Sequence, residues 1–428
     1  MEEIAIIGGG ASGLMAAHAA ACAAREAGAQ VRITVLEAAD RVGKSILASG
    51  NGRCNFSNAH IDAARYRNAE FVARAFAALS PEEVRAAFAE MGLTWYDGGA
   101  GWLYPVANKA SSVLDVLRFA LADAGVRVEC GAEVARVERT RPVGDARRSA
   151  PFLLRLADGR THTADAVVIA CGGRVVRALA PRELAGAFRS QRPVLGPLRT
   201  ETAPIKGLNN IRVRCRAALF APGAAHPKAV EEGEVLFRDY GVSGVAVFNL
   251  SRFAEAGDTL ALDLAFARDE AELAGELARR AGAWPARTAT DQLAGLVLPA
   301  VARAALAQAG FPPTQPLRRD DAARTARALK GFALEVTGIG DARQCQVSRG
   351  GFDVSAFDPA TCEAREMPGM FVTGEALDVD APCGGYNLHW AWTSGMLAGR
   401  AAAALAACGR VGGGAVTGRV HAAKGAGR

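Results

Sequence analysis

Residues 3–13 read EIAIIGGGASG, a short apolar stretch that leads directly into a turn with glycines at Gly8, Gly10 and Gly13. In a dinucleotide-binding βαβ unit, the first glycine permits a sharp turn and the second leaves room for the pyrophosphate. The third lets the following helix pack closely on its strand. We expect that helix from Leu14 to Glu26, with its free N–H groups and positive dipole end facing an anion. The start of the chain therefore predicts a dinucleotide pyrophosphate site.

The residues after this helix strengthen the prediction, because a glycine pattern alone is weak in a chain with 48 glycines. A turn at Gly28 precedes a second apolar stretch, Val31 to Leu36, which ends at Glu37. Glu37 follows the glycines at close to the spacing, roughly 20 residues, at which an acidic side chain accepts hydrogen bonds from the ribose hydroxyls. The alternative is an ordinary βαβ unit in which Glu37 is merely solvated.

Length and composition limit the class of protein. A chain of 428 residues, half of them hydrophobic, has room for two or three globular domains. Its net charge of +6 comes from scattered arginines without interleaved aromatic residues, so no nucleic-acid partner is predicted. The N-terminus lacks a positively charged leader, and the Ala-rich stretches 16–24 and 397–408 are too short or too charged to cross a bilayer. We therefore expect a cytoplasmic protein without a membrane partner.

The cysteines and histidines predict neither a metal site nor a redox disulfide. The nine cysteines are spread singly, with no C-x-x-C pair, and the six histidines form no ligand pattern. Cys54 in particular has no neighbouring cysteine, so it lacks the partner that a flavoenzyme of the disulfide-reductase type requires.

Predicted elements follow Glu37 along the first half of the chain. The segment Ala38–His60 is predicted to be a long functional loop, and residues 140–150 a hairpin tip. Gly172 ends an apolar strand, which predicts a second close backbone approach. The expected helices and strands are the helices Pro81–Met91 and Ser111–Ala124 and the strands Val126–Cys130, Glu133–Arg139, Phe152–Leu156 and Ala166–Ala170.

The middle third has a different character and contains neither a glycine cradle nor an acidic clamp. Short alternating runs predict a small antiparallel β element, and longer amphipathic runs predict a helical one. We expect the strands Arg212–Phe220, Glu234–Arg238 and Val245–Leu250, and the helices Arg268–Ala281, Asp291–Gln308 and Asp320–Leu329. This region is interpreted as an inserted substrate or cap region.

The C-terminal segment favours FAD over NAD. Met370–Gly374 is a short apolar strand followed by Glu375, and Gly384-Gly385 opens a last helix that runs to about residue 407. In an FAD domain built from two halves, the C-terminal part of the chain returns to the site with such a strand, an acidic residue and a helix. Its acidic residue binds the ribitol hydroxyls, and its helix N-terminus faces the pyrimidine end of the flavin. We therefore predict an α/β fold, a Rossmann-like FAD-binding domain of the glutathione-reductase type, split by an inserted β-rich plus helical region.

Three further motifs resemble a known family. They are residues 43–58 (GKSILASGNGRCNFSN), residues 233–237 (GEVLF) with 241–244 (GVSG), and residues 374–380 (GEALDVD) with 384–392 (GGYNLHWAW). The chain, over about residues 1–405, resembles the bacterial NAD(P)/FAD-dependent oxidoreductases called the "aminoacetone oxidase family" of FAD-binding flavoproteins. It departs from the family pattern at Lys44-Ser45 and at residues 348–352, both beside the expected flavin. The resemblance therefore does not identify the substrate. The resemblance implies FAD contacts at Ser12, Glu37, Lys44, the Ser49–Asn55 loop, Val134, Glu375, Asn387 and Leu388.

Together these arguments predict a set of cofactor-binding residues and a division into domains. The set is Gly8, Gly10, Ala11, Ser12, Gly13, Glu37, Ala38, Lys44, Ser49, Gly50, Gly52, Arg53, Cys54, Asn55, Val134, Gly172, Gly374, Glu375, Gly385, Asn387 and Leu388. The predicted division is an FAD-binding domain at 1–192 and 346–408, an inserted region at 193–345 (β-rich at 193–250, helical at 251–330) and a disordered tail at 409–428.

Catalytic residues stay unassigned, with three candidates. Cys54 is either a redox thiol or an inert buried cysteine. Tyr386 and His389 flank the start of the last helix, where they either donate a proton or only cap and pack. Arg53 and Asn55 could stabilise negative charge on phosphate or on the reduced flavin, or serve only to hold the loop.

The predicted function is that of an FAD-dependent oxidoreductase, which transfers a hydride between flavin N5 and a small organic substrate under the inserted region. No second dinucleotide-binding unit is visible in the sequence. The electron donor is therefore open: NAD(P)H reaching the flavin from the substrate side, another donor, or oxygen as acceptor. The alternative is a flavin-binding regulatory or RNA-modification partner protein.

Overall fold

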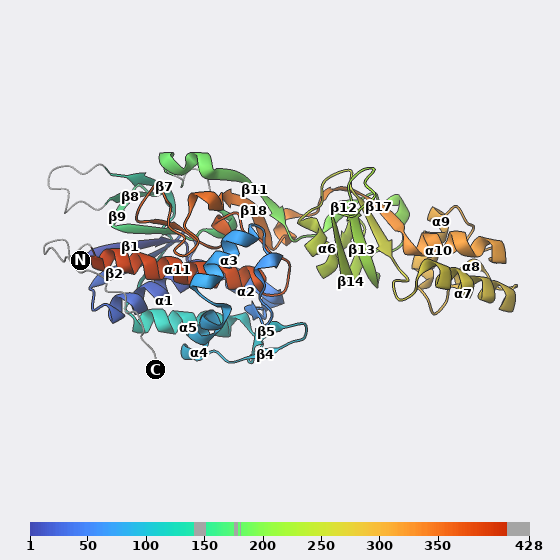
Figure 1. Cartoon of the computed structure of the whole chain (residues 1–428), viewed down its shortest axis with the longest axis horizontal. Helices are drawn as coiled ribbons and strands as arrows, with labels where there is room; N and C mark the ends of the chain where they lie inside the picture. Colours follow the sequence, from blue (N-terminus) through green and yellow to red (C-terminus); the bar gives the residue numbers. More distant parts are fainter. Residues whose placement is uncertain (141–150, 175–178, 180, 409–428) are drawn as a thin grey trace, which may run out of the picture.

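The computed structural model describes residues 1–140, 151–174, 179 and 181–408. Three regions lie in a row: a large α/β domain that contains both the N-terminus and the last helix, a β-barrel in the middle, and a group of helices at the far end (Figure 1). Two separate hydrophobic cores fit this arrangement. One belongs to the large domain, and the other joins the barrel with the helices. The predicted hairpin tip, apart from Thr140, and the predicted tail lie outside the described residues.

A five-stranded parallel sheet forms the centre of the large domain and confirms the predicted fold class. Its strands lie in the order β19-β10-β1-β2-β6. Strands β1, β10 and β19 and the middle of β2 are largely apolar and buried, as is usual in parallel sheets, whereas the edge strand β6 is mostly exposed. The C-terminal strand β19 pairs with β10, so the last part of the chain completes the sheet that the first part begins. The strands are β1 (Glu2–Ile7), β2 (Val31–Glu37), β6 (Arg127–Cys130), β10 (Ala166–Ile169) and β19 (Met370–Val372).

Helices cover the sheet, and two of them pack unusually closely. Helix α1 (Ala11–Glu26) lies along α11 (Tyr386–Cys408), and α5 (Ala110–Asp123) lies beside α1 (Figure 1). Helix α4 (Pro81–Glu90) begins with a capping box between Ser80 and Glu83, as its sequence indicates. Helix α3 (Ala69–Ala78) was not predicted.

The predicted long loop at 38–60 is wrong in part, because it contains ordered elements. The chain forms helix α2 (Lys44–Ala48), a 3₁₀ turn η1 (Ser49–Gly52) and strand β3 (Ser57–Asn58). Gly43 begins this stretch in the left-handed conformation with φ of 76°, and its N–H donates to the Gly9 carbonyl oxygen at 2.8 Å. Strand β3 pairs with β5 (Trp102–Pro105), which also pairs with β4 (Trp95–Asp97).

Two smaller sheets complete the large domain. One is antiparallel and consists of β7 (Val134–Arg139), β8 (Phe152–Leu156) and β9 (Thr161–Ala164). The other pairs β11 (Phe188–Val194) with β18 (Val347–Phe352), on the side that faces the barrel (Figure 1).

The middle region is a closed antiparallel barrel, of which only part was predicted. Its strands in spatial order are β12 (Leu198–Thr200), β15 (Gly241–Ser243), β14 (Ala229–Arg238), β13 (Arg212–Phe220), β16 (Thr259–Asp263) and β17 (Phe332–Ile339). Strands β16 and β17 lie beyond residue 250, so β structure is not confined to 193–250. Instead, the helices are inserted between these two strands of the barrel.

The predicted strand Val245–Leu250 is wrong, since the segment forms helix α6 (Val245–Ser251). Its β-branched residues favour a strand, but packing against β14 decides the conformation. Ala246, Val247 and Leu250 fall on one helical face and are buried.

The helical region divides one predicted helix in two. Residues 291–308 form the end of α8 (Ala289–Gln292) and all of α9 (Pro299–Gln308), because Pro299 occupies the first turn of a new helix. The other helices lie close to their predicted positions, as α7 (Glu270–Ala283) and α10 (Ala322–Lys330).

Candidate cofactor site

Four predicted site residues follow the carboxyl ends of neighbouring strands. Gly8 follows β1, Gly172 follows β10 and Glu375 follows β19, while Glu37 is the last residue of β2. Since these strands are parallel and adjacent, the four positions lie along one edge of the sheet. That edge is where open α/β sheets bind their ligands.

The glycine turn has the geometry of an anion cradle. Gly8 has φ of +109°, and its N–H donates to the Leu36 carbonyl oxygen at 2.8 Å. A Cβ atom on Gly13 would stand 1.9 Å from the Gly8 carbonyl oxygen, so only glycine lets α1 begin this close to the strand. At Gly10 the nearest atom to an added Cβ is the Ser45 Oγ at 3.4 Å, so the turn is open on that side. The space beside the N-terminus of α1 therefore fits a phosphate.

The Glu37 carboxylate is fixed beside this turn by two backbone groups. One oxygen accepts the N–H of Gly9 at 2.7 Å, and the other accepts that of Ala39 at 2.8 Å. A carboxylate has about four acceptor positions, so both oxygens retain capacity for the ribose hydroxyls. Val134 begins β7 next to this point, because Ala132 donates its N–H to the Glu37 carbonyl oxygen at 2.9 Å. The contact of Glu37 with Gly9 was not predicted from the sequence.

The segment from Asp40 to Asn55, which contains α2, is held by contacts within itself and with Tyr104 of β5. Lys44 forms an ion pair with Asp40 at 2.5 Å, and the guanidinium of Arg53 lies 4.7 Å from the ring centre of Tyr104. The Ser49 hydroxyl donates to the Ile46 carbonyl oxygen at 2.6 Å. Gly50 adopts a positive φ of 56°, and a Cβ there would stand 2.8 Å from the Asn55 nitrogen. These contacts hold the loop in one conformation.

Asn55 provides a direct test of whether this region fits a ligand. Its side chain is buried, and its Oδ1 has no hydrogen-bond partner among the described residues. The oxygen lies at the start of α11, since a Cβ on Gly385 would stand 2.9 Å from it. An orphaned buried acceptor is rare in a folded protein. It fits the N–H donor of a flat ring such as the flavin pyrimidine.

Glu375 lies beside the end of β10, close to the turn at Gly172. Its Oε1 accepts the N–H of Ser348 at 2.6 Å and lies so near Gly173 that a Cβ there would be 2.3 Å away. Burial raises the pKa of Glu375 to about 7. Gly172 has φ of +58° and nothing within 4 Å of an added Cβ, so the space above it is open.

The start of α11 approaches the loop and the N-terminal helix together. Gly385 has φ of +91°, and a Cβ there would stand 2.2 Å from the Ser57 carbonyl oxygen. Ser12, buried in the first turn of α1, lies against Gly374, where an added Cβ would be 2.9 Å from the serine Oγ. The predicted residues from both ends of the chain are therefore brought to one place. Ala11 and Ala38 lie beside the glycine turn and Glu37, and Leu388 lies in the first turn of α11.

The Asn387 side chain has a structural role that the sequence did not indicate. Its amide donates to the Ala381 carbonyl oxygen at 2.8 Å, and its Oδ1 accepts the Ala381 N–H at 2.9 Å. These two bonds close the loop that precedes α11.

The structure favours packing roles for two of the three catalytic candidates. Burial raises the pKa of the Cys54 thiol to about 11, and Cys54 has no exposed surface. Burial, with a smaller effect of Arg85, lowers the pKa of His389 to about 3, and its Nδ1 lies 2.9 Å from the Ser57 Oγ. Neither a thiolate nor an imidazolium forms there near neutral pH. Tyr386 donates its hydroxyl to the His60 carbonyl oxygen at 3.2 Å.

A buried ionic cluster joins the barrel to the loop before α11, and sequence reasoning missed it. Asp380 has no exposed surface and binds the guanidinium groups of Arg252 at 2.7 Å and Arg349 at 2.8 Å. Arg252 directly follows α6, whereas Arg349 lies in β18. The signal that could have found the cluster is the repeated aspartate of the 374–380 motif, Asp378 and Asp380, which a charged partner must accompany if it is buried.

Two absences concern the described residues alone. In residues 1–140, 151–174, 179 and 181–408, no three His, Cys, Asp or Glu side chains are grouped as metal ligands. Among the helices in those ranges, none combines the length and the apolar character that a membrane span needs.

Comparison with known proteins identifies the family. Residues 2–401 match the model of the HI0933-like protein Rossmann domain. A curated relative, the 3-dehydro-bile acid delta(4,6)-reductase of Clostridium scindens, is 32% identical over 94% of this chain and 99% of its own length. The ribosomal RNA dihydrouridine synthase of Escherichia coli is 27% identical over 91% of this chain and 95% of its own length. A solved 3-ketosteroid-delta4-(5alpha)-dehydrogenase from Rhodococcus jostii RHA1 aligns over 94% of this chain and 97% of its own, with 16% identity and a TM-score of 0.43.

The match extends over nearly the whole described chain, and the cradle, the acidic residues and the orphaned acceptor lie together along one sheet edge. The chain belongs to the HI0933-like Rossmann family and is an FAD-binding oxidoreductase.

Proposed function

We propose that this oxidoreductase transfers a hydride between flavin N5 and a small organic substrate held where the inserted region meets the large domain. The observation that carries the proposal is the closure of one site by both ends of the chain. β1 and α1 open it, and β19, Glu375 and the start of α11 complete it, with the unpaired Asn55 Oδ1 between them. FAD supplies hydride chemistry when bound.

The side chains of this protein would hold the cofactor and exclude water. The glycine turn and the α1 N-terminus would bind the pyrophosphate, and Glu37 would bind the adenosine ribose. Glu375 would accept a hydrogen bond from a ribitol hydroxyl, and Asn55 from a ring N–H. Arg53 lies at the surface of the loop, where its charge would favour an anionic cofactor.

The names of the curated relatives favour a class of substrate. A delta(4,6)-reductase and a dihydrouridine synthase both saturate a carbon–carbon double bond in a ring. We propose the same reaction class here, with a small cyclic compound as substrate and NAD(P)H as electron donor. The narrower "aminoacetone oxidase" grouping and the cytoplasmic location remain predictions.

Flavin spectroscopy tests this function. Protein reconstituted with excess FAD should show the flavin band at about 450 nm, and NADH or NADPH should bleach it rapidly in a stopped-flow experiment. A colourless protein would refute FAD binding. A coloured protein that no reductant bleaches would instead favour the binding-protein alternative.

Ribosomal RNA is the second candidate substrate, favoured by the Escherichia coli relative. It conflicts with the prediction from scattered charge that no nucleic acid is bound. The two candidates differ in a direct measurement: the dihydrouridine content of ribosomal RNA from cells with and without the gene. An unchanged content supports the small-molecule substrate, and a loss that the wild-type gene restores supports RNA.

A further inference from the structure

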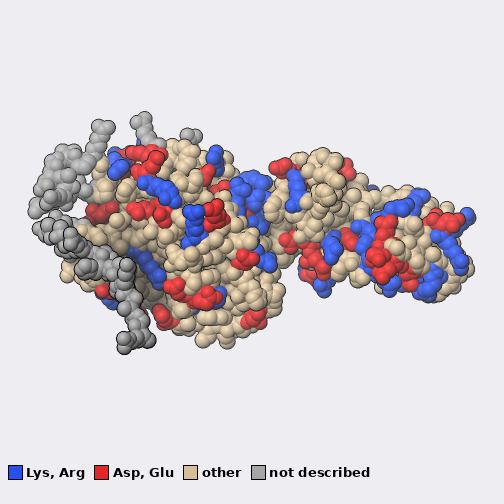
Figure 2. All heavy atoms as spheres, in the orientation of Figure 1, with Lys and Arg blue, Asp and Glu red and all other residues tan. Residues whose placement is uncertain are grey.

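A basic hollow lies between the large domain and the barrel, and none of the residues assigned to FAD lines it. Its volume is about 980 Å³. Figure 2 shows basic side chains gathered at the narrow junction between these two regions. Six cationic side chains line the hollow against three carboxylates, so its wall is positive. The cations are Arg67, Arg189, Arg192, Lys228, Arg252 and Arg349.

Carboxylates within the protein compensate the cations of the inner wall. Arg252 and Arg349 share the buried Asp380, and Lys228 binds Asp258 at 2.8 Å. Arg252 and Arg349 are largely buried, so their charges are fixed in position, whereas Lys228 is exposed at the edge of the hollow. The two buried arginines form a rigid floor that a ligand would not have to organise.

The arginines of the outer wall have N–H donors that are not used in ion pairs with the described residues. Arg192 is exposed and makes no ion pair in the described part of the chain, and its guanidinium touches only the Arg252 carbonyl oxygen at 3.5 Å. Arg67 uses its Nε for Asp378 at 3.0 Å and remains 43% exposed. Arg189 binds Asp353 at 3.2 Å through one terminal nitrogen. Guanidinium groups facing a concave surface raise the local concentration of anions and bind phosphate through two parallel hydrogen bonds.

An aromatic ring adds a second kind of contact. Phe253 lines the hollow and is 41% exposed, which is unusual for a phenylalanine beside a charged wall. The guanidinium groups of Arg252 and Arg349 lie 5.3 and 5.7 Å from its ring centre. A phosphate site with an exposed aromatic ring matches the two parts of a nucleotide, the anion and the flat base.

The hollow begins directly beside the cofactor edge. In β18 the Ser348 N–H binds Glu375, while the next side chain, Arg349, binds Asp380 and lines the hollow. Successive side chains of a strand point to opposite faces. One strand therefore separates the proposed ribitol contact from the basic wall.

We propose that this hollow binds the phosphates and adenine of a reduced pyridine dinucleotide, the electron donor of the proposed reaction. The inference rests on that function and gives the donor a site in a chain whose sequence shows no second Rossmann unit. Arg192, Arg189 and Arg67 bind the phosphates, and Phe253 packs on the base. The donor gives a hydride to FAD and, with one proton, leaves it as FADH₂ and itself as the oxidised dinucleotide.

A single nucleotide fits the hollow better than an RNA chain does. On the face shown in Figure 2, acidic and basic side chains are mixed along the inserted region, and no continuous basic stripe leads away from the group at the junction. An RNA strand needs a longer basic track.

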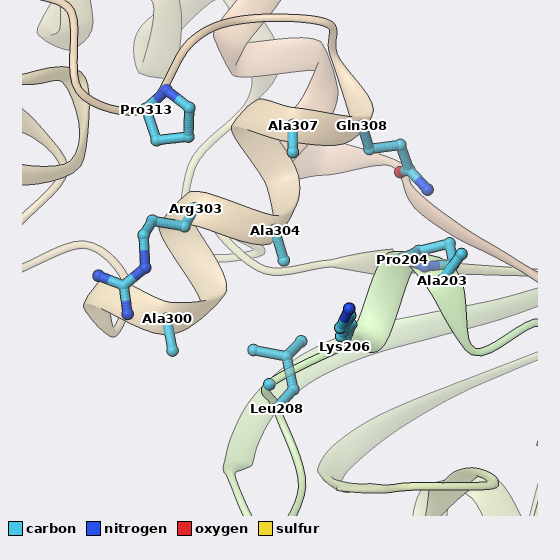
Figure 3. A pocket seen from close by; sticks show the side chains of 11 residues that line it. Ala203, Pro204, Lys206, Leu208, Ala300, Arg303, Ala304, Ala307, Gln308 and Pro313 are labelled. Carbon is cyan, nitrogen blue, oxygen red and sulfur yellow. The ribbon is translucent and has the colours of Figure 1, made fainter.

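A second cavity supplies the matched control. It measures about 500 Å³ and lies between the barrel and α9, where Arg303 and Lys206 flank a wall of small side chains (Figure 3). Arg303, like Arg192, is exposed and forms no ion pair with any residue described. Replacing either arginine by alanine lowers the net charge by the same amount, so the two variants differ only in the position at which the charge is lost.

The experiment measures NADP⁺ binding to the FAD-loaded protein by calorimetry, for wild type, Arg192→Ala and Arg303→Ala. We expect Arg192→Ala to weaken NADP⁺ binding by about tenfold or more, the loss of a charge-assisted contact. Arg303→Ala should leave it within about twofold. NAD⁺ is the second probe, and a weaker affinity for it would assign one arginine to the 2′-phosphate. Equal binding by all three proteins, or none by wild type, overturns the site.

Two further readouts separate this site from the proposed function. Reduction by NADPH should slow in Arg192→Ala at low NADPH concentration, whereas reduction by dithionite should not change. If NADP⁺ binds as expected but NADPH does not reduce the flavin, the donor assignment fails and the site stands. If NADPH reduces wild type and Arg192→Ala equally, the function stands and the site fails. Binding of a single-stranded RNA oligomer that Arg192→Ala weakens, without NADP⁺ binding, also overturns the proposal.

Discussion

Gly399 of α11 lies against Ala16 of α1 so closely that an added Cβ would stand 2.2 Å from the Ala16 carbonyl oxygen. Gly395, one turn earlier, has the same relationship to Ser12, at 2.4 Å. Because both neighbours are backbone atoms, they cannot rotate away. The contact holds the two helices whose N-termini border the cofactor site.

We therefore expect Gly399→Ala to lower the free energy of unfolding by on the order of 1 to 3 kcal/mol and to weaken FAD binding. Urea denaturation and FAD titration check this. Gly275→Ala is the control, since Gly275 lies on the exposed side of α7 with nothing within 4 Å. That change should be neutral or stabilising by up to about 1 kcal/mol. A stable Gly399→Ala protein with unchanged FAD affinity would contradict the role of the contact.

Replacement of Glu37 by alanine should weaken FAD binding by roughly tenfold to a hundredfold, because it removes a charge-assisted contact worth about 1.5 to 3 kcal/mol. It also leaves the N–H groups of Gly9 and Ala39 without their acceptor. Fluorescence titration of the apo-protein measures the affinity, with the exposed Glu26→Ala as control. If Glu37→Ala binds FAD as well as wild type, Glu37 is not the ribose ligand.

Glu375 should make the apo-protein less stable as the pH rises. Burial raises its folded-state pKa to about 7 from an ordinary value of 4.5, so the folded state holds the proton more tightly. Its contribution to stability is complete below about pH 4.5 and is lost as the pH rises through about 7. Glu375→Gln does not titrate, so the stability of wild type relative to the variant should fall between about pH 5 and pH 8. Urea denaturation at both pH values measures this, and parallel pH profiles would exclude a buried carboxyl with a raised pKa.

FAD binding gives a second readout for the same residue. Glu375→Ala removes an acceptor for a ribitol hydroxyl, at a cost of roughly 1 to 3 kcal/mol of cofactor affinity. The melting temperature of wild type should rise with added FAD, and that of the variant should rise less at equal FAD. Identical shifts would mean that the C-terminal segment does not complete the site.

Cys54→Ala should leave the rate of flavin reduction within about twofold of wild type, because burial raises the thiol pKa to about 11 and little thiolate forms. In native protein, thiol reagents should modify the exposed Cys130 and Cys408 and leave Cys54 intact. Mass spectrometry of the labelled peptides checks the second point. A rate more than tenfold lower with FAD retained would return Cys54 to the catalytic candidates.

The parts of the fold that were predicted depend on short-range signals. The turn at Gly8–Gly13, the strand that ends at Glu37 and the helix that begins at Pro81 are each encoded within a few residues of the sequence. Strand β10 and the apolar parts of β1 and β2 were recognisable as short hydrophobic runs. The family motifs then predicted that the C-terminal segment contributes to the same site.

The parts that were missed depend on long-range pairing or on packing. The barrel closes because β17 pairs with both β12 and β16. Leu198 pairs with Ile339, more than 100 residues later in the sequence, and a local sequence pattern does not predict such a distant pairing. Helix α6 forms because the segment packs on β14, although its β-branched residues favour a strand. The pairing of Asp380 with Arg252 joins two regions of the chain, so the sequence shows its members but not their contact.

The pairing of β19 with β10 also determines when the protein can acquire its cofactor. On the ribosome, the glycine turn and Glu37 emerge before the barrel, yet the strand and helix that complete the pocket are synthesised after it. A nascent chain that stops before residue 370 has half of the pocket and the whole of the barrel. FAD capture therefore requires synthesis through β19 and the start of α11, and a chain truncated before residue 370 should be recognisable by its lack of colour.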